Sequence, residues 1–221
     1  MMDLGEQLAE SRRQFVALLK SSDRRGARRM LRRALATGID PVLLQREVVT
    51  KAVDEVGGEW QEQVASLSQV YATGLIVEDS METLSSLEGT GEGPVDRVVI
   101  GTARGDFHGL GKRIVAAFLR AAGFGVVDLG MSVPAVAFVD AALKESARLI
   151  AVSALMVDTA LGIHEVRQEM DKRKAGGVRL LVGGAPFRFN PDLFRLVGAD
   201  ATASNAYEAA RVVRALLEGA R

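Results

Sequence analysis

The segment from Gly105 to Lys112, GDFHGLGK, gathers the side chains of this sequence that are best suited to chemistry. It contains three glycines and one of the only two histidines in the 221-residue chain. A glycine-rich loop that leads into a helix can bind a phosphate through its main-chain N–H groups. An imidazole can act as a general base or as a metal ligand. The segment therefore allows three kinds of site.

The phosphate and hydrolase interpretations both lack a required residue. A P-loop needs glycine, four residues, then Gly-Lys and a hydroxyl residue, but Asp106 and Arg113 hold the first and last of these positions. A hydrolase could combine His108 and Asp106 with Ser153 as the nucleophile. Ser153, however, lies in VSALM, outside the GxSxG turn that would expose its hydroxyl.

A metal site is the third interpretation. Asp106 and His108 are two residues apart in what should be an extended loop, so their side chains can point the same way. A carboxylate that accepts from one ring nitrogen makes the other nitrogen a better metal donor. The chain has no cysteine and no second histidine nearby, so we expect such a metal to bring its other ligands as a cofactor. The simpler alternative is a surface histidine beside a tight turn.

The first half of the chain is predicted to be helical. Between residues 3 and 86 apolar residues recur at a spacing of three and four, which predicts four to five helices. We expect breaks at residues 21–23, at residues 37–41 and near Gly57-Gly58, with Asp40-Pro41 starting a helix. The glycine-rich linker EGTGEGP follows. A helical cap domain is therefore expected over residues 1–90.

The second half alternates short apolar runs with helical patterns, which is typical of a parallel sheet covered on both faces. The predicted strands are 97–102, 125–130, 149–154, 178–184 and 200–202, and the predicted helices are 110–122, 134–147, 160–175, 192–197 and 205–218. This predicts an α plus α/β protein in which a doubly wound, flavodoxin-like sheet of five strands forms a domain over residues 95–221. Ligands bind such sheets at the carboxyl ends of the strands.

Composition limits the partners. Basic and acidic residues are equal at 28 each, so no overall charge attracts nucleic acid or an acidic membrane, and we expect neither as a partner. No segment resembles a signal peptide, and none has 18 uninterrupted apolar residues. Together with the absence of cysteine, these features favour a cytoplasmic location.

Three separated blocks carry a family resemblance. Asp106-Phe-His108-Gly-Leu-Gly111 is followed after 41 residues by Ser153-Ala-Leu155, and after 27 more by Gly183-Gly184. With these blocks the chain resembles cobalamin-binding proteins that hold the cofactor base-off on a histidine, including the cobalamin domain of methionine synthase. The helical half is similar to that of corrinoid proteins in methyl-transfer systems for methanol, methylamines or methoxylated aromatics, so the resemblance spans nearly the whole chain.

The resemblance implies cobalamin as the cofactor, alternating between a Co(I) state and methylcobalamin. His108 would be the lower axial ligand of cobalt, Asp106 would hold the other ring nitrogen, and Thr159 would complete a proton relay to solvent. Ser153 would bind the displaced base of the cofactor. Val157 stands where the family often has threonine, so one hydrogen bond near the tail or the corrin would be missing.

The resemblance also implies a set of cofactor-binding residues. Gly109 and Gly111 would let the main chain approach the corrin, and Gly183 and Gly184 would leave room for the nucleotide tail. The other residues implied to bind the cofactor are Phe107, Leu110, Leu155 and Val157, together with Ala185.

By the same resemblance the chain would carry a methyl group between two partner enzymes. These are a substrate:corrinoid methyltransferase and a methylcorrinoid:acceptor methyltransferase that uses tetrahydrofolate or a thiol, with a reductive activase as a third partner. Because catalysis of each transfer would lie on those partners, whether this chain is itself an enzyme stays open. The alternative is a cobalamin-dependent light or ligand sensor that acts through a protein partner.

Two features of the helical half have alternative interpretations. The arginines between Arg24 and Arg33 form either a solvated helix face or a docking face for an acidic partner or nucleic acid. Trp60 either packs in the helical core or covers the upper face of the corrin. Light-sensing cobalamin proteins have a histidine eleven residues after a related tryptophan, but this chain has Tyr71 there, which disfavours the sensor.

Overall fold

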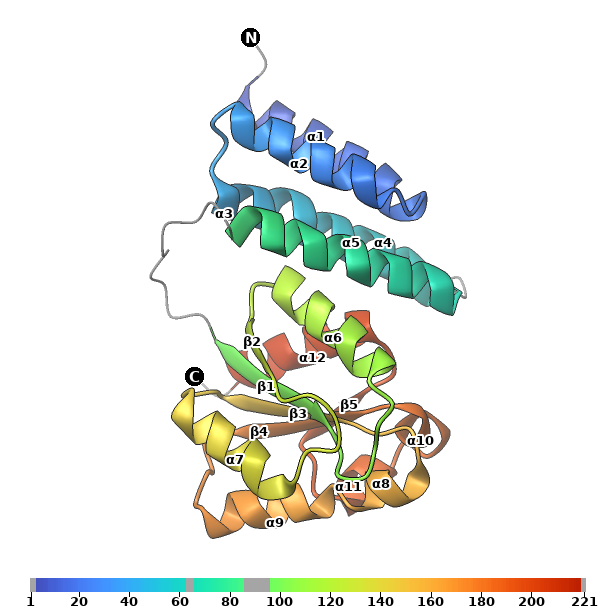
Figure 1. Ribbon diagram of the computed structural model, residues 1–221, viewed down its shortest axis with the longest axis vertical. Coiled ribbons are helices and arrows are strands. Elements are labelled where there is room, and N and C mark those ends of the chain that lie inside the picture. The colour runs from blue at the N-terminus through green and yellow to red at the C-terminus, as the bar shows by residue number, and fades with distance from the viewer. Residues whose placement is uncertain (1–2, 63–65, 86–95, 220–221) are drawn as a thin grey trace. The chain divides into compact units, whose positions relative to one another are not determined.

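The computed structural model describes residues 3–62, 66–85 and 96–219. These residues form two compact units that divide near residue 95. The first unit is helical, and the second is built on a β-sheet (Figure 1). Both units bury apolar side chains in their interiors.

The helical unit is assembled from amphipathic helices. They are α1 (Leu4–Lys20), α2 (Arg24–Ala36), α3 (Pro41–Leu44), α4 (Lys51–Glu62) and α5 (Leu67–Ser85), and a π-helical segment, η1 (Gln45–Thr50), joins α3 to α4. The Asp40 side chain accepts from the Leu43 N–H at 2.9 Å, and Pro41 occupies the first helical position. This confirms the helix start predicted from Asp40-Pro41.

One predicted helix boundary in this unit is wrong. The break expected near Gly57 and Gly58 is absent from the structure, because α4 continues through both residues to Glu62. A glycine inside a helix costs about 1 kcal/mol. Val53 and Val56 of the same helix are buried, and the burial of this apolar face outweighs that cost. The two earlier breaks that the sequence predicts are confirmed.

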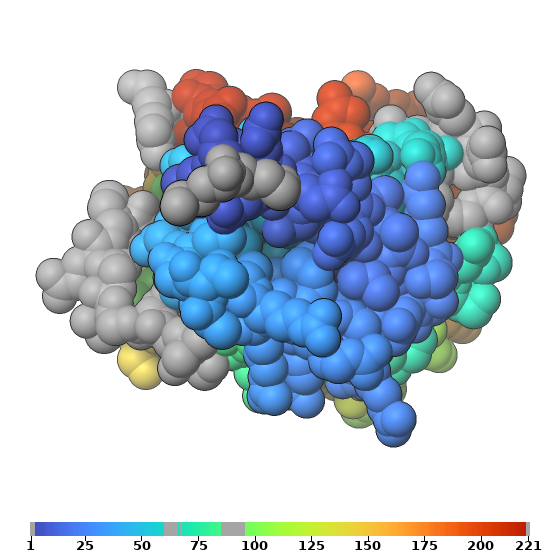
Figure 2. Space-filling model, turned by 90° about the horizontal axis from the view of Figure 1, so that it is seen from above, coloured from blue at the N-terminus to red at the C-terminus, as the bar shows by residue number. Residues whose placement is uncertain are grey.

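The solvent-facing side of α2 consists largely of arginine. Every arginine of this helix is exposed, namely Arg24, Arg25, Arg28, Arg29, Arg32 and Arg33. In the view of Figure 2, α1 and α2 (in blue) form the face turned to the reader. The Arg24 guanidinium pairs with Asp79 of α5, with Nη2 2.6 Å from Oδ1. A solvated face and a docking face are both compatible with this exposure. The Trp60 side chain lies outside the described residues.

The second unit has the predicted doubly wound sheet. Its strands are β1 (Arg97–Thr102), β2 (Gly125–Asp128), β3 (Leu149–Ser153), β4 (Arg179–Gly183) and β5 (Ala201–Ala203). All pairings are parallel, in the order β2-β1-β3-β4-β5. The central strands are buried along almost their whole length, as expected for a sheet covered on both sides. The predicted fold class is confirmed.

Helices cover both faces of this sheet. They are α6 (Leu110–Ala121), α7 (Ala135–Lys144), α8 (Val157–Leu161), α9 (His164–Lys172), α10 (Ala185–Phe189), α11 (Leu193–Leu196) and α12 (Ala206–Glu218). Figure 1 shows α6 and α12 on one face and α7 and α9 on the other. Phe138 of α7 and Met170 of α9 pack with Val99 and Ile150 of the strands in one buried cluster.

The helix predicted over residues 160–175 is wrong in its extent. The structure has two helices there, α8 and α9, separated at Gly162 and Ile163, and the first begins already at Val157. Thr159 therefore lies inside α8 and not in the loop before a helix. The short helix α10 was not predicted, because a segment of five residues is too short to show a helical period. No helix among the described residues is long and apolar enough to cross a membrane.

The register of the sheet places three strand ends in one row. Thr102 of β1 pairs with Ser153 of β3, and Ser153 pairs with Gly183 of β4. Since the strands are parallel, the loops that follow these three residues leave the sheet at the same edge. This carboxyl edge brings together segments that are far apart in the sequence.

Candidate functional site

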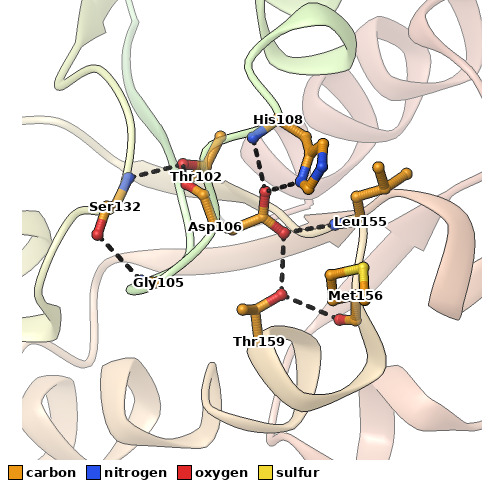
Figure 3. A network of polar contacts seen from close by, with 8 residues as sticks. All are labelled: Thr102, Gly105, Asp106, His108, Ser132, Leu155, Met156 and Thr159. Atoms are coloured by element: carbon orange, nitrogen blue, oxygen red, sulfur yellow. Dashed lines mark hydrogen bonds and ion pairs between the residues drawn. The ribbon is translucent and has the colours of Figure 1, made fainter.

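The carboxyl edge is organised around the side chain of Asp106. This carboxylate is fully buried, and it accepts hydrogen bonds at both oxygens (Figure 3). Oδ1 accepts from the His108 N–H at 2.9 Å and lies 3.0 Å from His108 Nδ1. Oδ2 accepts from the Leu155 N–H at 2.7 Å and from the Thr159 hydroxyl at 2.9 Å. One carboxylate thus ties the loop after β1 to the turn after β3 and to α8.

These donors determine the charge of Asp106. Burial is the largest influence and by itself would raise the pKa of the carboxyl. The N–H groups of Leu155 and His108, the Thr159 hydroxyl and the His108 ring together outweigh burial and lower the pKa below its ordinary value. Asp106 is therefore a carboxylate, and it is stabilised mainly by neutral dipoles of fixed direction.

The ionised Asp106 fixes the tautomer of His108. A carboxylate can only accept, so the contact with Nδ1 requires a proton on that nitrogen. In the neutral ring this leaves the lone pair on Nε2, and the side chain is 54% exposed. An imidazole with one nitrogen held by a carboxylate and the other open is the arrangement seen in metal-binding histidines.

Large apolar side chains are exposed around this edge. Phe107 is 68% exposed, and further exposed apolar residues come from the segments that follow β1, β2 and β3. They are Leu110, Met131, Leu155, Met156 and Val157. An exposed apolar group of this kind marks a surface that binds another molecule.

The donor set fits a metal that arrives inside a larger ligand. Among the described residues no group of three or more histidine, cysteine, aspartate or glutamate side chains could hold a metal ion by itself. His108 offers a single nitrogen, and apolar side chains surround it. A flat macrocycle with one open axial position matches both properties.

The glycines of the edge serve different purposes. Gly184 has φ +116° and ψ −178°, a conformation accessible essentially to glycine alone, and a Cβ at this position would lie 1.9 Å from the Ala154 carbonyl oxygen. The backbone of this chain itself therefore requires Gly184. By contrast, a Cβ at Gly183 would meet nothing closer than 3.5 Å. A Cβ at Gly111 would meet nothing within 4 Å.

The remaining predicted residues lie along the same edge. Gly109 approaches Met131, and a Cβ on this glycine would lie 2.9 Å from the Met131 sulfur. The Ser153 carbonyl accepts from the Ala103 N–H at 2.9 Å, and its side chain is partly buried. Ala185 begins α10 directly after β4.

Several residues of the edge were not singled out from the sequence. Thr102 and Ser132 bond the main chain of Asp106, and the main-chain N–H of Leu155 bonds its carboxylate. A hydroxyl at the end of an apolar strand, as at Thr102, is a signal that could have been noticed. A main-chain donor such as that of Leu155 leaves no trace in the sequence.

Lys112, which ends the glycine-rich segment, is paired within the chain. Its ammonium group pairs with both carboxylate oxygens of Asp128 at the end of β2, and its side chain is only 5% exposed. Asp128 Oδ1 also accepts from the Gly130 N–H at 2.8 Å. The lysine therefore holds the start of α6 to the loop after β2.

Comparisons with known proteins match both units. A family model described as a B12 binding domain matches residues 96–211, and a second model of the same description matches residues 11–85. Trimethylamine corrinoid protein 1 of Methanosarcina acetivorans is 37% identical over 190 residues, which cover 83% of this chain and 86% of that protein.

Solved structures give the same picture. The methanol:cobalamin methyltransferase complex MtaBC from Methanosarcina barkeri matches with a TM-score of 0.79 at 26% identity, over 97% of this chain and 83% of that chain. A cobalamin-binding protein from Desulfitobacterium hafniense matches with a TM-score of 0.73 at 20% identity, over 91% of this chain and 96% of that chain. The second match bears on the fold alone.

Proposed function

The chain belongs to the B12-binding family and is a methyl-carrying corrinoid protein, and from this premise we propose that it holds cobalamin base-off with His108 as the lower ligand of cobalt. The family resemblance inferred from the three sequence blocks is confirmed, and so is a cobalamin-type corrinoid as the cofactor. The ligand, the roles of the site residues and the identity of the partners are parts of the proposal.

A single observation carries the ligand assignment. The buried carboxylate of Asp106 contacts Nδ1 of His108 at 3.0 Å and leaves Nε2 open on a half-exposed ring. The only other histidine of the chain, His164, lies on α9, where its ring nitrogen is 2.9 Å from the Leu161 carbonyl oxygen. His108 is therefore the histidine with both the free nitrogen and the orienting partner that axial ligation requires.

Asp106 and Thr159 would have different roles in supporting His108. When bound, the cobalt supplies the nucleophile that takes up a methyl group and gives it away again. Asp106 holds the Nδ1 proton of His108 and keeps the ring in a donating orientation. The Thr159 hydroxyl donates to Asp106 and is partly exposed, so it gives this proton a route to solvent.

The other predicted residues would surround the cofactor. Phe107, Leu110, Leu155 and Val157 offer exposed apolar surface to the corrin. Ser153 would meet the displaced base, and the open space at Gly111 and around Gly183 would admit the ligand. We assign Gly184 a structural role that does not depend on contact with the nucleotide tail. The carbonyl group of Ala154 excludes a side chain at this position even without the cofactor.

We propose two methyltransferases as partners, one that loads the cofactor and one that unloads it to tetrahydrofolate or a thiol. Support comes from the MtaBC structure, which is a complex with a methyltransferase, and from the curated relatives, which are corrinoid proteins of trimethylamine, dimethylamine and monomethylamine. Methylated amines are therefore the first donors to test. A reductive activase would restore the reduced cofactor after accidental oxidation.

The experiment isolates the proposed histidine ligand. The protein is produced in cells supplied with ¹⁵N-labelled histidine, purified, incubated with hydroxocobalamin and desalted. The bound cobalt is then reduced to Co(II) and examined by electron paramagnetic resonance. We expect retained corrin whose cobalt signal is split by ¹⁵N of the protein. His108→Ala should lose this splitting and still retain corrin, because the apolar edge is intact.

His164→Ala is the matched control, since it removes the other histidine and should leave the signal unchanged. A spectrum of His108→Ala with the ¹⁵N splitting intact would overturn the ligand assignment. Failure of the wild-type chain to retain any corrin would contradict the proposed site as a whole.

A further inference from the structure

Thr102 stands at the centre of a second set of hydrogen bonds behind the Asp106 carboxylate. It is the last residue of β1, and it is fully buried. Its hydroxyl donates to the main-chain carbonyl of Asp106 and accepts from the Ser132 N–H at 2.8 Å (Figure 3). Both capacities of this buried hydroxyl are used, and both are directed at the main chain beside the site.

Ser132 reaches the same main chain from the loop between β2 and α7. Its N–H also lies 3.0 Å from the Asp106 carbonyl oxygen, and its hydroxyl accepts from the Gly105 N–H at 3.0 Å. Ser132 has φ +52°, a left-handed conformation that serine adopts at a cost. Such strained residues persist where surrounding contacts determine the conformation, and they cluster at functional sites.

The loop that these residues hold has no regular structure of its own. Residues 103–109 are neither helix nor strand, and Arg104, Gly105, Phe107 and His108 are exposed. The Asp106 carboxylate at its centre must meet donors from three segments at once. A small rotation of the Asp106 main chain would lengthen some of these contacts and shorten others, because both oxygens are engaged.

We propose that Thr102 and Ser132 are positioning residues, which fix the main chain at Gly105 and Asp106 and thereby aim the carboxylate at His108. They act through Asp106. The inference rests on the proposed function, because aiming the carboxylate matters only if His108 binds cobalt. The pairing of Lys112 with Asp128 fixes the start of the β2–α7 loop. This limits the movement of Ser132 within the same loop.

The test measures how much of the bound cofactor has histidine as its lower ligand. Thr102→Val has nearly the shape of threonine but lacks the hydroxyl. The variant is saturated with hydroxocobalamin, reduced to Co(II), and its histidine-bound and histidine-free fractions are read from the ¹⁵N-split signal. We expect the ratio of free to bound to rise roughly fivefold, because both hydrogen bonds of the Thr102 hydroxyl are lost while the Ser132 N–H keeps its bond to the Asp106 carbonyl oxygen. Thr102→Ser restores the hydroxyl and should restore the ratio.

Ser132→Ala is a second variant that tests the same inference if Thr102→Val folds poorly because Thr102 is buried. It removes only the hydroxyl that accepts from Gly105, on a partly exposed side chain, and should raise the same ratio in the same direction by a smaller factor. A purely structural role would lower the unfolding temperature of both variants and leave the ratio at its wild-type value, which would overturn the inference.

The outcome for the wild-type chain separates this inference from the proposed function. If the wild type shows no splitting from histidine, the proposed ligand is wrong. Thr102 and Ser132 then cannot act by positioning His108 for cobalt. If the wild type shows the splitting and Thr102→Val and Ser132→Ala show it to the same extent, His108 is the ligand and the positioning role is wrong.

Discussion

Asp106 in the sheet unit and Asp79 in the helical unit are largely buried carboxylates that are kept ionised by different means. Asp106 in the sheet unit is fully buried and is held by two main-chain N–H groups, a hydroxyl and the His108 ring. Asp79 in the helical unit has a side chain 15% exposed and is held by the Arg24 guanidinium, which is itself half exposed. The pKa of each is lowered.

The causes of the two lowered pKa values differ. For Asp79 the leading cause is the hydrogen bond from Arg24, helped by the charges of Arg24 and Arg28 and opposed by burial. For Asp106 burial is the strongest influence, and fixed neutral donors overcome it. The charge of the half-exposed Arg24 is open to screening by solvent and salt, whereas the main-chain donors to Asp106 are fixed in direction by the fold. A carboxylate that must orient a ring therefore needs the second kind of support.

The largest effect should come from removing the buried charge. Asp106→Asn keeps one acceptor oxygen and replaces the other by an NH₂ group. The donors that the second oxygen accepts from in the wild type then face another donor and lose their acceptor. We expect the free energy of unfolding of the corrin-free protein to fall by about 3 kcal/mol. Urea denaturation followed by far-ultraviolet circular dichroism measures this change.

Asp79→Asn is the matched control for that measurement. It removes the same charge where an exposed arginine is the partner, and exposed ion pairs contribute about 1 kcal/mol or less. Equal losses for the two variants would show that fixed donors give Asp106 no special stabilisation, and the comparison would then fail.

Salt and acid should separate the two carboxylates further. Since both folded-state pKa values lie below the ordinary value of about 3.9, each carboxylate stabilises its unit above that pH. This contribution is lost as the pH falls through the lowered folded-state pKa. In 1 M salt the screening length is about 3 Å, so the pKa of Asp79 should rise toward its ordinary value. The pKa of Asp106 should change less, because three of its four donors are uncharged groups and its carboxylate is buried away from the salt solution.

Titration of the ¹³C carboxyl signals at low and high salt measures both pKa values in one sample. A salt-induced rise at Asp106 as large as that at Asp79 would contradict the distinction between buried fixed donors and a solvent-exposed cation.

The smallest effect is expected at Gly111. It tests whether glycine at this position serves the stability of the protein or the binding of the cofactor. Gly111→Ala places a methyl group in open space in the first turn of α6, and alanine is the better helix former. We expect the free energy of unfolding without corrin to rise by about 0.5 kcal/mol. Cobalamin affinity, measured by equilibrium dialysis, should fall because the corrin would occupy that space.

Gly177→Ala is the control for Gly111→Ala. It also adds a methyl group in open space, but in the turn before β4, at the amino end of the sheet. It should leave cobalamin affinity unchanged. Undiminished affinity in Gly111→Ala would exclude this glycine from the cofactor site.

The sheet was predictable from the sequence because its strands are apolar throughout and its helices are periodic. The predicted starts and ends of the strands agree with the structure to within two residues. The spacing of Asp106 and His108 in a loop predicts that the two side chains can meet, and the structure places them in hydrogen-bond contact.

Other features depend on tertiary contacts that the sequence does not express. The continuation of α4 through Gly57 and Gly58 depends on what its apolar face buries. The early start of α8 places Thr159 against Asp106, and only the folded chain brings these residues together. The bond from the Leu155 N–H was beyond sequence reasoning, because every residue except proline carries that donor.

Gly184 has a consequence for mutational libraries made from this scaffold. The requirement for glycine there arises within the chain, at the carbonyl of Ala154. In a saturation library sorted first for folded expression and then for red colour from bound corrin, variants at position 184 should disappear at the first sort. Variants at His108 should pass it. Position 184 thus serves as an internal standard for the folding sort, against which the tolerance of every other glycine at this edge can be ranked.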